Sequence, residues 1–427
     1  MSGKSLDCRN HPLGFAAVDL FWFHNTYVFN TNPFLGSGDI IGGGGAIPSI
    51  PSKSRNNWDI FAELNIPVIK GMEVNAAIRY DDYSDVQNGT TWNPKFSLRY
   101  TPITQLLLRG SWGTGFRAPT LPELFQPPTQ SATGSNLTDP QRCPVTHSIT
   151  DCNVQFTDLL GGNTSLKPEK STQWTIGGVV EPITGYSLAV DYWNIKISDV
   201  VGTLGEQNIF GNTGELIPQS VAAGLITRFP QSPQDVALGI PGPVQYGLLN
   251  NLNIQELQVN GLDFNVKLRF PQFDWGQVTF SWLSTYYINW KQTDLQTGQL
   301  VNYAGKSVGG VAVVTAGPGF PASLPRYKSN AALNWNYGPW AATLTNLYQD
   351  GYEDDSGTRR VGSYMLWDLT GSWSGMKNWT FMAGIKNLAN HNPPFSDQAE
   401  AFQVGYDPTY ADPRGRFFWG SVKFAWQ

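Results

Sequence analysis

The chain has 427 residues with a formal net charge of −5; 14% of them are charged and 13% aromatic, and 45 are glycines. This aromatic content excludes a disordered chain, and the shortage of charged residues is untypical of a helical enzyme. The negative net charge argues against a broad nucleic-acid-binding surface. No run approaches the roughly 18 to 20 apolar residues of a membrane helix, so a membrane protein of mean hydropathy −0.26 would have to be a β-barrel.

Residues 1–57 are predicted to hold one strand, at 18–30, and a flexible loop around the glycine run at 42–45. The glycine run is not interpreted as a phosphate-binding loop, because no helix signal follows it. Residues 1–12 lack the cationic start and apolar core of a secretory signal. The sequence therefore predicts either a cytosolic chain or part of a longer precursor.

From residue 58 onward, apolar and polar residues alternate repeatedly, which is typical of extended strands. In the segment that starts at Tyr327, for example, Leu333 and Trp335 fall on one face and Lys328 and Asn334 on the other. A soluble antiparallel sheet alternates in the same way, so a single hairpin does not decide between the two environments. The pattern predicts about 13 strands, or 14 with 18–30. They lie at 59–66, 74–81, 95–100, 106–116, 174–180, 188–192, 262–270, 278–286, 327–337, 340–348, 365–373, 379–385 and 418–426.

The connections between these strands alternate strictly between short and long. Tight turns fall near residues 70, 102, 183, 273, 338 and 376, and polar segments separate them at 82–93, 117–171, 198–256, 291–325, 349–362 and 389–415. All short turns therefore lie at one end of the strands, which is typical of outer-membrane barrels. We predict an all-β fold in which residues 58–427 form an antiparallel transmembrane β-barrel, with long extracellular loops at 117–171, 198–256, 291–325 and 389–415.

Few residues suggest a chemical site. The four histidines are scattered, and no nucleophile elbow, P-loop or dinucleotide fingerprint is present, so we expect no enzyme, cofactor or metal site. Cys143 and Cys152 lie close together in a predicted long loop, which favours a disulfide in an oxidising compartment over two reduced surface thiols. The alternation places four basic residues on the predicted lumen face: Arg79, Arg99, Lys267 and Arg269. We expect them to keep the interior hydrated rather than to bind a substrate.

Several segments resemble TonB-dependent outer-membrane receptors. The most specific is residues 108–125, LRGSWGTGFRAPTLPELF, and others in the same order are 163–171 (NTSLKPEKS), 191–195 (DYWNI), 387–390 (NLAN) and 415–418 (GRFF). The resemblance implies that the last strand is a membrane-assembly signal formed by Phe418, Val422, Phe424 and Trp426. Gln427 follows the aromatic residue on which such signals usually end.

The resemblance also implies a function. Receptors of this kind have 22 strands and a plugged lumen, so the strands of this chain correspond to the last 14. Their signal peptide, TonB-contacting box and plug are not found in this sequence. The expected activity is TonB-energised uptake of a scarce nutrient across the outer membrane of a Gram-negative bacterium. The resemblance allows a ferric siderophore, cobalamin or a carbohydrate, and the residues do not choose among them.

This chain without a plug is not expected to perform energised uptake alone, since TonB acts through the plug. Its expected partners are outer-membrane lipid and a small nutrient at the extracellular loops. One alternative is a self-contained passive porin of about 14 strands, because an even strand count permits closure. Another is a soluble β-rich binding protein such as a propeller, but no repeat period supports it.

Overall fold

The structure is a computed structural model. It describes residues 16–27, 52–87, 89–134, 136–203, 206–210, 224–294, 298–308, 322–354, 357, 359–397 and 405–426. None of the described helices is long and apolar enough to cross a membrane. The glycine run at 42–45 lies outside the described residues.

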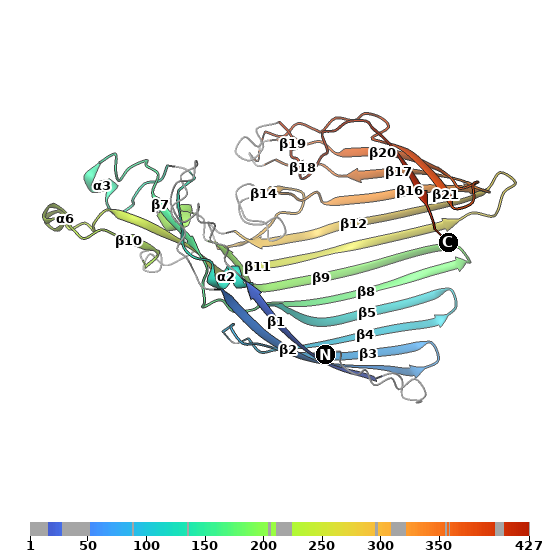
Figure 1. The fold of residues 1–427 in the computed structure, drawn as a ribbon, viewed down its shortest axis with the longest axis horizontal. Helices are drawn as coiled ribbons and strands as arrows, with labels where there is room; N and C mark the ends of the chain where they lie inside the picture. The colour runs from blue at the N-terminus through green and yellow to red at the C-terminus, as the bar shows by residue number, and fades with distance from the viewer. Residues whose placement is uncertain are drawn as a thin grey trace.

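A single curved wall of 14 antiparallel strands dominates the fold, and each strand pairs with the strand that follows it around the wall (Figure 1). This confirms the predicted all-β barrel architecture and includes the predicted first strand. In their order around the wall, the strands are β1 (Ala16–Tyr27), β2 (Lys53–Ile69), β3 (Met72–Tyr83), β4 (Thr91–Ile103), β5 (Leu106–Arg117), β8 (Glu169–Ile183), β9 (Tyr186–Thr203), β11 (Val244–Arg269), β12 (Gln277–Thr293), β16 (Tyr327–Tyr337), β17 (Trp340–Gln349), β20 (Tyr364–Trp373), β21 (Trp379–Lys386) and β22 (Phe417–Phe424).

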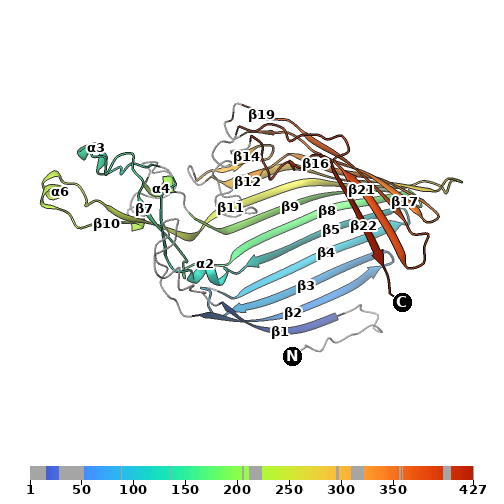
Figure 2. The ribbon, with the colours of Figure 1, turned by 45° about the horizontal axis from the view of Figure 1, so that its top comes forward.

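The wall is open. Among the described residues, β1 pairs only with β2, and β22 pairs only with β21. Figure 2 shows the wall curving between these two strands without a ladder that joins them. Each edge therefore presents unpaired backbone N–H and C=O groups, which closure into a barrel would satisfy.

Short turns and long connections lie at opposite ends of the wall, as predicted (Figure 1). The turn between β2 and β3 shows why its residues are small. Gly71 has a φ of +81°, and a Cβ there would lie 2.5 Å from the backbone oxygen of Thr101 near the end of β4. Only glycine fits this backbone without strain.

No described segment covers the apolar face of the wall. Ile176, Leu333 and Phe418 keep 61%, 44% and 66% of their surface exposed. Buried hydrophobic clusters occur instead in and beside the long connections, around Phe210, Tyr352 and Leu124. The soluble-sheet alternative is therefore wrong, because its apolar face would pack on a core; an uncovered apolar face fits lipid.

The long connections are more ordered than the sequence suggested. They contain α2 (Leu121–Phe125), α3 (Cys143–Thr146), α4 (Glu206–Phe210), α6 (Pro233–Leu238) and the short strands β6 (Thr129–Ala132), β7 (Thr157–Gly161), β10 (Ile226–Arg228), β13 (Leu300–Asn302), β14 (Ser307–Val308), β15 (Ala322–Ser323), β18 (Tyr352–Glu353) and β19 (Arg360–Val361). Helices this short span too few residues to show a helical period. In addition, β11 begins at Val244, inside the predicted loop 198–256, and β2 begins at Lys53, before the expected division at residue 58.

Candidate functional site

Two long connections combine into one folded body, which projects beyond the wall at its long-loop end (Figure 1). We call it the loop lobe, and it comprises the described residues of 121–161 and 206–250. Its sheet places β7 between β6 and the beginning of β11, and β10 pairs with β11 on the other side. Phe156 and Phe210 stack at its centre with ring centroids 4.9 Å apart. The lobe therefore has a core of its own.

Buried ion pairs hold the two connections together. Arg142 Nε donates to Asp151 Oδ1 at 3.0 Å within its own connection, and Arg142 Nη1 donates to Asp235 Oδ1 at 2.8 Å in the other. A second pair joins the same two connections: Arg228 Nη1, in the later one, donates to Asp139 Oδ2, in the earlier one, at 2.6 Å. Removal of either partner of a buried pair leaves an uncompensated charge, so these contacts fix how the connections meet.

Asp235 also closes the first turn of α6. The pKa of its carboxyl is lowered to about 2, because the backbone N–H of Ser232 donates to it and Arg142 donates as well. Ser232 and Asp235 form a capping box, and so do Thr120 and Glu123 at α2. This three-residue spacing was the available signal for helices inside the predicted loops.

Cys143 and Cys152 form a disulfide in the lobe, with an S–S distance of 2.00 Å. The bridge encloses the short segment that carries Asp151 and begins next to Arg142. It therefore restrains both partners of the first ion pair.

A second acidic group in the lobe has no counter-charge among the residues that the structure describes. Asp158 on β7 is 1% exposed, and neither of its carboxylate oxygens has a hydrogen-bond partner among the described residues. Burial, followed by repulsion from Glu206 on α4, raises the pKa of Asp158 to about 7. Glu206 is held in place by the backbone N–H of Gly134, which donates to both of its oxygens. Sequence reasoning missed this pair, because its members come from different connections.

The four basic residues assigned to the lumen lie in separate parts of the wall, two on β3 and β4 and two on β11. Arg79 on β3 bridges Asp59 and Asp81 at 3.1 and 2.8 Å, and Arg99 on β4 lies 4.0 Å from Glu73. Lys267 and Arg269 are exposed on β11. Neither has an ion-pair partner among the described residues. The structure thus does not gather the four into one site. The described residues also contain no group of three His, Cys, Asp or Glu side chains that could hold a metal.

The four residues of the expected assembly signal lie at the open edge of the wall. Phe418, Val422 and Phe424 alternate along β22, and Trp426 follows it. All four are exposed, and the ring of Phe424 lies between Trp379 and Trp426, at 4.7 and 5.0 Å. They form an apolar aromatic strip on the outside of the last strand.

The comparisons with known proteins agree with this architecture. The sequence profile described as "TonB dependent receptor-like, beta-barrel" matches residues 4–388. The chain belongs to this family. Its members are transport receptors, not enzymes, in agreement with the sequence analysis.

Individual relatives are distant in sequence. The ferric enterobactin receptor PirA of Pseudomonas aeruginosa is 21% identical over 402 residues, an alignment that covers 91% of this chain and 44% of that protein. A solved structure of a variant of the P. aeruginosa ferric enterobactin receptor PfeA has a TM-score of 0.66 at 18% identity, and covers 98% of this chain and 52% of its own. The siderophore receptor PirA of Acinetobacter baumannii gives 0.65 at 15%, with 99% and 53% covered. The chain spans about half the length of these relatives, and the structural likeness shows the fold.

Proposed function

We propose that this chain is the barrel portion of an outer-membrane receptor that takes up a ferric siderophore in a Gram-negative bacterium. The family membership across residues 4–388 carries the proposal. Enterobactin receptors among the relatives favour an iron chelate over cobalamin or a carbohydrate as the ligand. The strands from β1 to β22 supply the barrel wall, so β1 and the start of β2, which lie before the expected division at residue 58, belong to it.

The ligand is first captured at the long-loop end, by the loops at 117–171, 198–256, 291–325 and 389–415. The loop lobe supports this assignment, because buried ion pairs and a disulfide hold it in one shape before any ligand arrives. A preformed site loses less conformational entropy on binding. Energised passage requires the TonB system, which acts on a plug and not on the strands of the wall.

The passive porin has no observation in its favour. A porin of these 14 strands needs a ladder between β1 and β22, and the described residues contain none.

The function is tested in cells of the source bacterium that lack the gene. Binding of 55Fe-labelled tris-catecholate, hydroxamate and carboxylate chelates to intact cells at 4 °C measures capture, and iron-limited growth on each chelate measures uptake. We expect cells without the gene to lose both binding of one chelate class and growth on it. Reintroduction of the gene should restore both. A host without TonB should still bind that chelate and should not grow on it.

Growth on cobalamin-dependent medium and on a glycan as sole carbon source provides the controls. A growth defect restricted to the cobalamin-dependent medium or to the glycan would mean that the ligand is cobalamin or a carbohydrate and not a ferric siderophore. Unchanged binding of every chelate would overturn the proposed function.

A further inference from the structure

A group of basic side chains lies on the outer face of the wall, toward its long-loop end. Lys196 on β9, Gln258 on β11 and Lys291 on β12 are direct partners across three neighbouring strands. Lys170 on β8 lies one diagonal step away, because its partner on β9 is Ser198, two residues beyond Lys196. We call Lys170, Lys196, Gln258 and Lys291 the rim patch.

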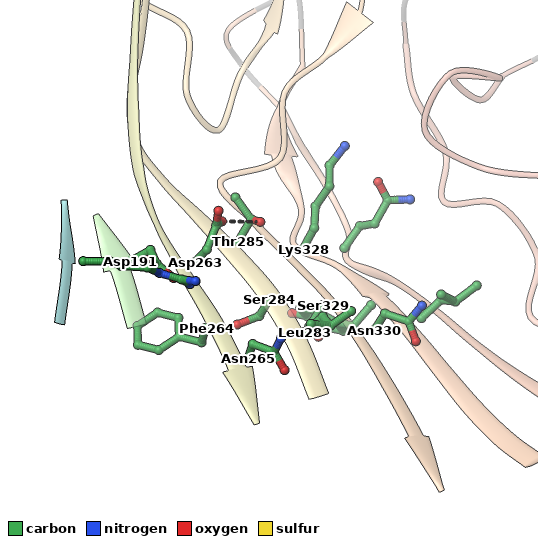
Figure 3. A pocket seen from close by; sticks show the side chains of 14 residues that line it. Asp191, Asp263, Phe264, Asn265, Leu283, Ser284, Thr285, Lys328, Ser329 and Asn330 are labelled. Atoms are coloured by element: carbon green, nitrogen blue, oxygen red, sulfur yellow. Dashed lines mark hydrogen bonds and ion pairs between the residues drawn. The ribbon is translucent and has the colours of Figure 1, made fainter. Parts of the chain in front are cut away.

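Strand pairing places the rim patch on the outer face. Directly opposed residues share a face of the sheet, and every second residue of a strand returns to that face. Lys170 is six residues before Ile176, which is 61% exposed on the apolar face. The other face of the same strands belongs to the lumen, where the Thr285 hydroxyl on β12 donates to Asp263 on β11 at 2.7 Å (Figure 3). Receptors of this family have a plugged lumen, so molecules of the surrounding membrane meet only the outer face.

The rim patch lies about one membrane thickness away from the short turns. β9 begins at Tyr186 beside a short turn, and Lys196 is ten residues further along the strand. At about 3.3 Å per residue and a strand tilt of roughly 40°, Lys196 stands about 25 Å above that turn. The apolar band of an outer-membrane barrel is also about 25 Å tall. The lysines are therefore at the level of the lipid head groups at the long-loop end.

The rim patch keeps an excess of positive charge. Lys196 Nζ lies 2.9 Å from Glu256 Oε2, and the two side chains are 48% and 33% exposed. Glu169, next to Lys170, is turned to the opposite face, where it pairs with Arg117. Among the residues that the structure describes, no other carboxylate lies within ion-pair distance of the three lysines. Two of the three ammonium groups are therefore left for an anion from outside the chain.

A chain of amide groups separates the rim patch from the apolar band. Asn260 Nδ2 donates to the Tyr192 hydroxyl at 3.0 Å, and Asn289 Nδ2 donates to Asn260 Oδ1 at 3.1 Å. Asn302 Nδ2 donates in turn to Asn289 Oδ1 at 2.9 Å. Asn260 is two residues from Gln258, or about 7 Å along the strand. The amides thus offer polar contacts at the level where the acyl chains of a lipid join its head group.

Beyond the amides, toward the short turns, the outer face is aromatic and apolar. The rings of Trp174 and Tyr192 lie 5.0 Å apart, and those of Phe264 and Trp282 lie 6.1 Å apart. Trp174 and Ile176 keep 39% and 61% of their surface exposed. The same four strands thus present apolar, amide and ammonium side chains in succession. This is the order of acyl chains, linkage and anionic head in a lipid, and the excess of positive charge favours an anionic head over a neutral one.

We propose that the rim patch binds the phosphate head of an anionic lipid in the leaflet at the long-loop end. Lys170, Lys196 and Lys291 contact the phosphate, and the acyl chains lie on the apolar band. Basic side chains at the membrane surface recognise anionic head groups in this way. β8, β9, β11 and β12 are in the middle of the wall, so completion of the barrel at either edge leaves their outer face toward lipid. The proposal rests on the placement of the wall in a membrane and not on which nutrient the receptor takes up.

The test uses the full chain in detergent micelles, with binding of dioleoyl phosphatidic acid measured by native mass spectrometry. Dioleoylglycerol, which has the same acyl chains without phosphate, and glycerol 3-phosphate, which has the phosphate without acyl chains, are the ligand controls. We expect the first phosphatidic acid to bind at least tenfold more tightly than either control. A phosphatidic acid with a photoreactive acyl chain should label the outer face of β8, β9, β11 and β12.

Four variants separate a specific site from general charge attraction. Lys170→Gln and Lys291→Gln should each weaken phosphatidic acid binding about fivefold, the loss expected for one cation at a membrane surface. Glu256→Gln should strengthen binding, because it releases Lys196 for the lipid. Lys267→Gln removes an exposed cation from the lumen face of β11 and should leave the affinity unchanged.

Equal weakening by Lys267→Gln and Lys291→Gln, weakening by Glu256→Gln, or labelling confined to other strands would each overturn the proposal. Binding of glycerol 3-phosphate as tight as that of phosphatidic acid would mean a site for soluble anions. Equally tight binding of dioleoylglycerol would mean an apolar surface that does not recognise the head group. Because the assay contains no iron and no TonB, the lipid site and the proposed receptor function can fail independently.

Discussion

Asp158 shows at the scale of one residue how the loop lobe responds to pH. Its pKa is about 7 in the folded lobe, against about 3.9 in an unfolded chain. Between these values the folded lobe holds a proton that the unfolded lobe has released. The contribution of Asp158 to the stability of the lobe is therefore fully present below about pH 4, is lost as the pH rises toward 7, and changes little above that.

We predict that Asp158→Asn removes this pH dependence and stabilises the lobe at pH 8 by on the order of 2 kcal/mol, because it replaces a buried unpaired carboxylate with a neutral amide. Hydrogen exchange at the amides of Phe156 and Leu137, corrected for intrinsic rates between pH 5 and 8, measures the effect. Asp274→Asn, at an exposed acid in a short turn, is the control and should change nothing. Protection that increases with pH in the unmodified protein would contradict the assigned titration.

Residue patterns predicted local partners better than distant ones. Cys143 and Cys152 were paired from their spacing, and the structure joins them. By contrast, the second ion-pair partner of Arg142 is Asp235, which lies in another connection. Likewise, Arg109 on β5 donates to Asp191 on β9 across Gly177 on β8, where a Cβ would lie 2.1 Å from Asp191 Oδ1. This contact exists only because β5, β8 and β9 are neighbours in the sheet. Strand order sets such contacts, and no local sequence signal contains it.

At the scale of the element, alternation with a period of two identified the wall strands, because each strand has lipid on one side and a wet lumen on the other. The same alternation did not predict the elements of the loop lobe, because its short strands and helices do not have one buried and one exposed face. It also placed the start of β11 too late, since the segment that begins at Val244 pairs inside the lobe with β7 and β10.

The two faces of β16 give a direct element-scale prediction. Leu333 lies on the exposed apolar face, and Asn334, on the opposite face, accepts a hydrogen bond from the Thr343 hydroxyl at 2.9 Å. Leu333→Arg should destabilise the folded chain by roughly 2 to 4 kcal/mol in a bilayer, because it places a charge in hydrocarbon, and Asn334→Arg should cost much less. Urea unfolding in lipid vesicles measures both. Equal losses of stability would mean that the assignment of Leu333 to the lipid face and Asn334 to the lumen face is wrong.

At the scale of the whole molecule, the sequence predicted the number of strands and the sorting of turns and loops. It left closure undecided, because 14 strands are an even number and an even number permits a barrel. Closure depends on whether the first and last strands meet, and the alternation of side chains along a strand carries no information about that. The observed strand pairings carry that information, because β1 and β22 each have one partner strand among the described residues.

A crosslink between the two edges tests the open wall. Leu20 on β1 and Val422 on β22 are both exposed, each at 58%. In a chain with Leu20→Cys and Val422→Cys, we expect no intramolecular disulfide between these positions after mild oxidation in vesicles, because paired cysteines need Cα atoms less than about 7 Å apart. Ile60→Cys with Leu20→Cys is the positive control, since these residues are direct partners in the β1–β2 ladder. Non-reducing electrophoresis after proteolysis distinguishes the two. Efficient joining of Leu20→Cys to Val422→Cys would mean that these strands close on themselves, and the porin would then replace the receptor barrel as the better account.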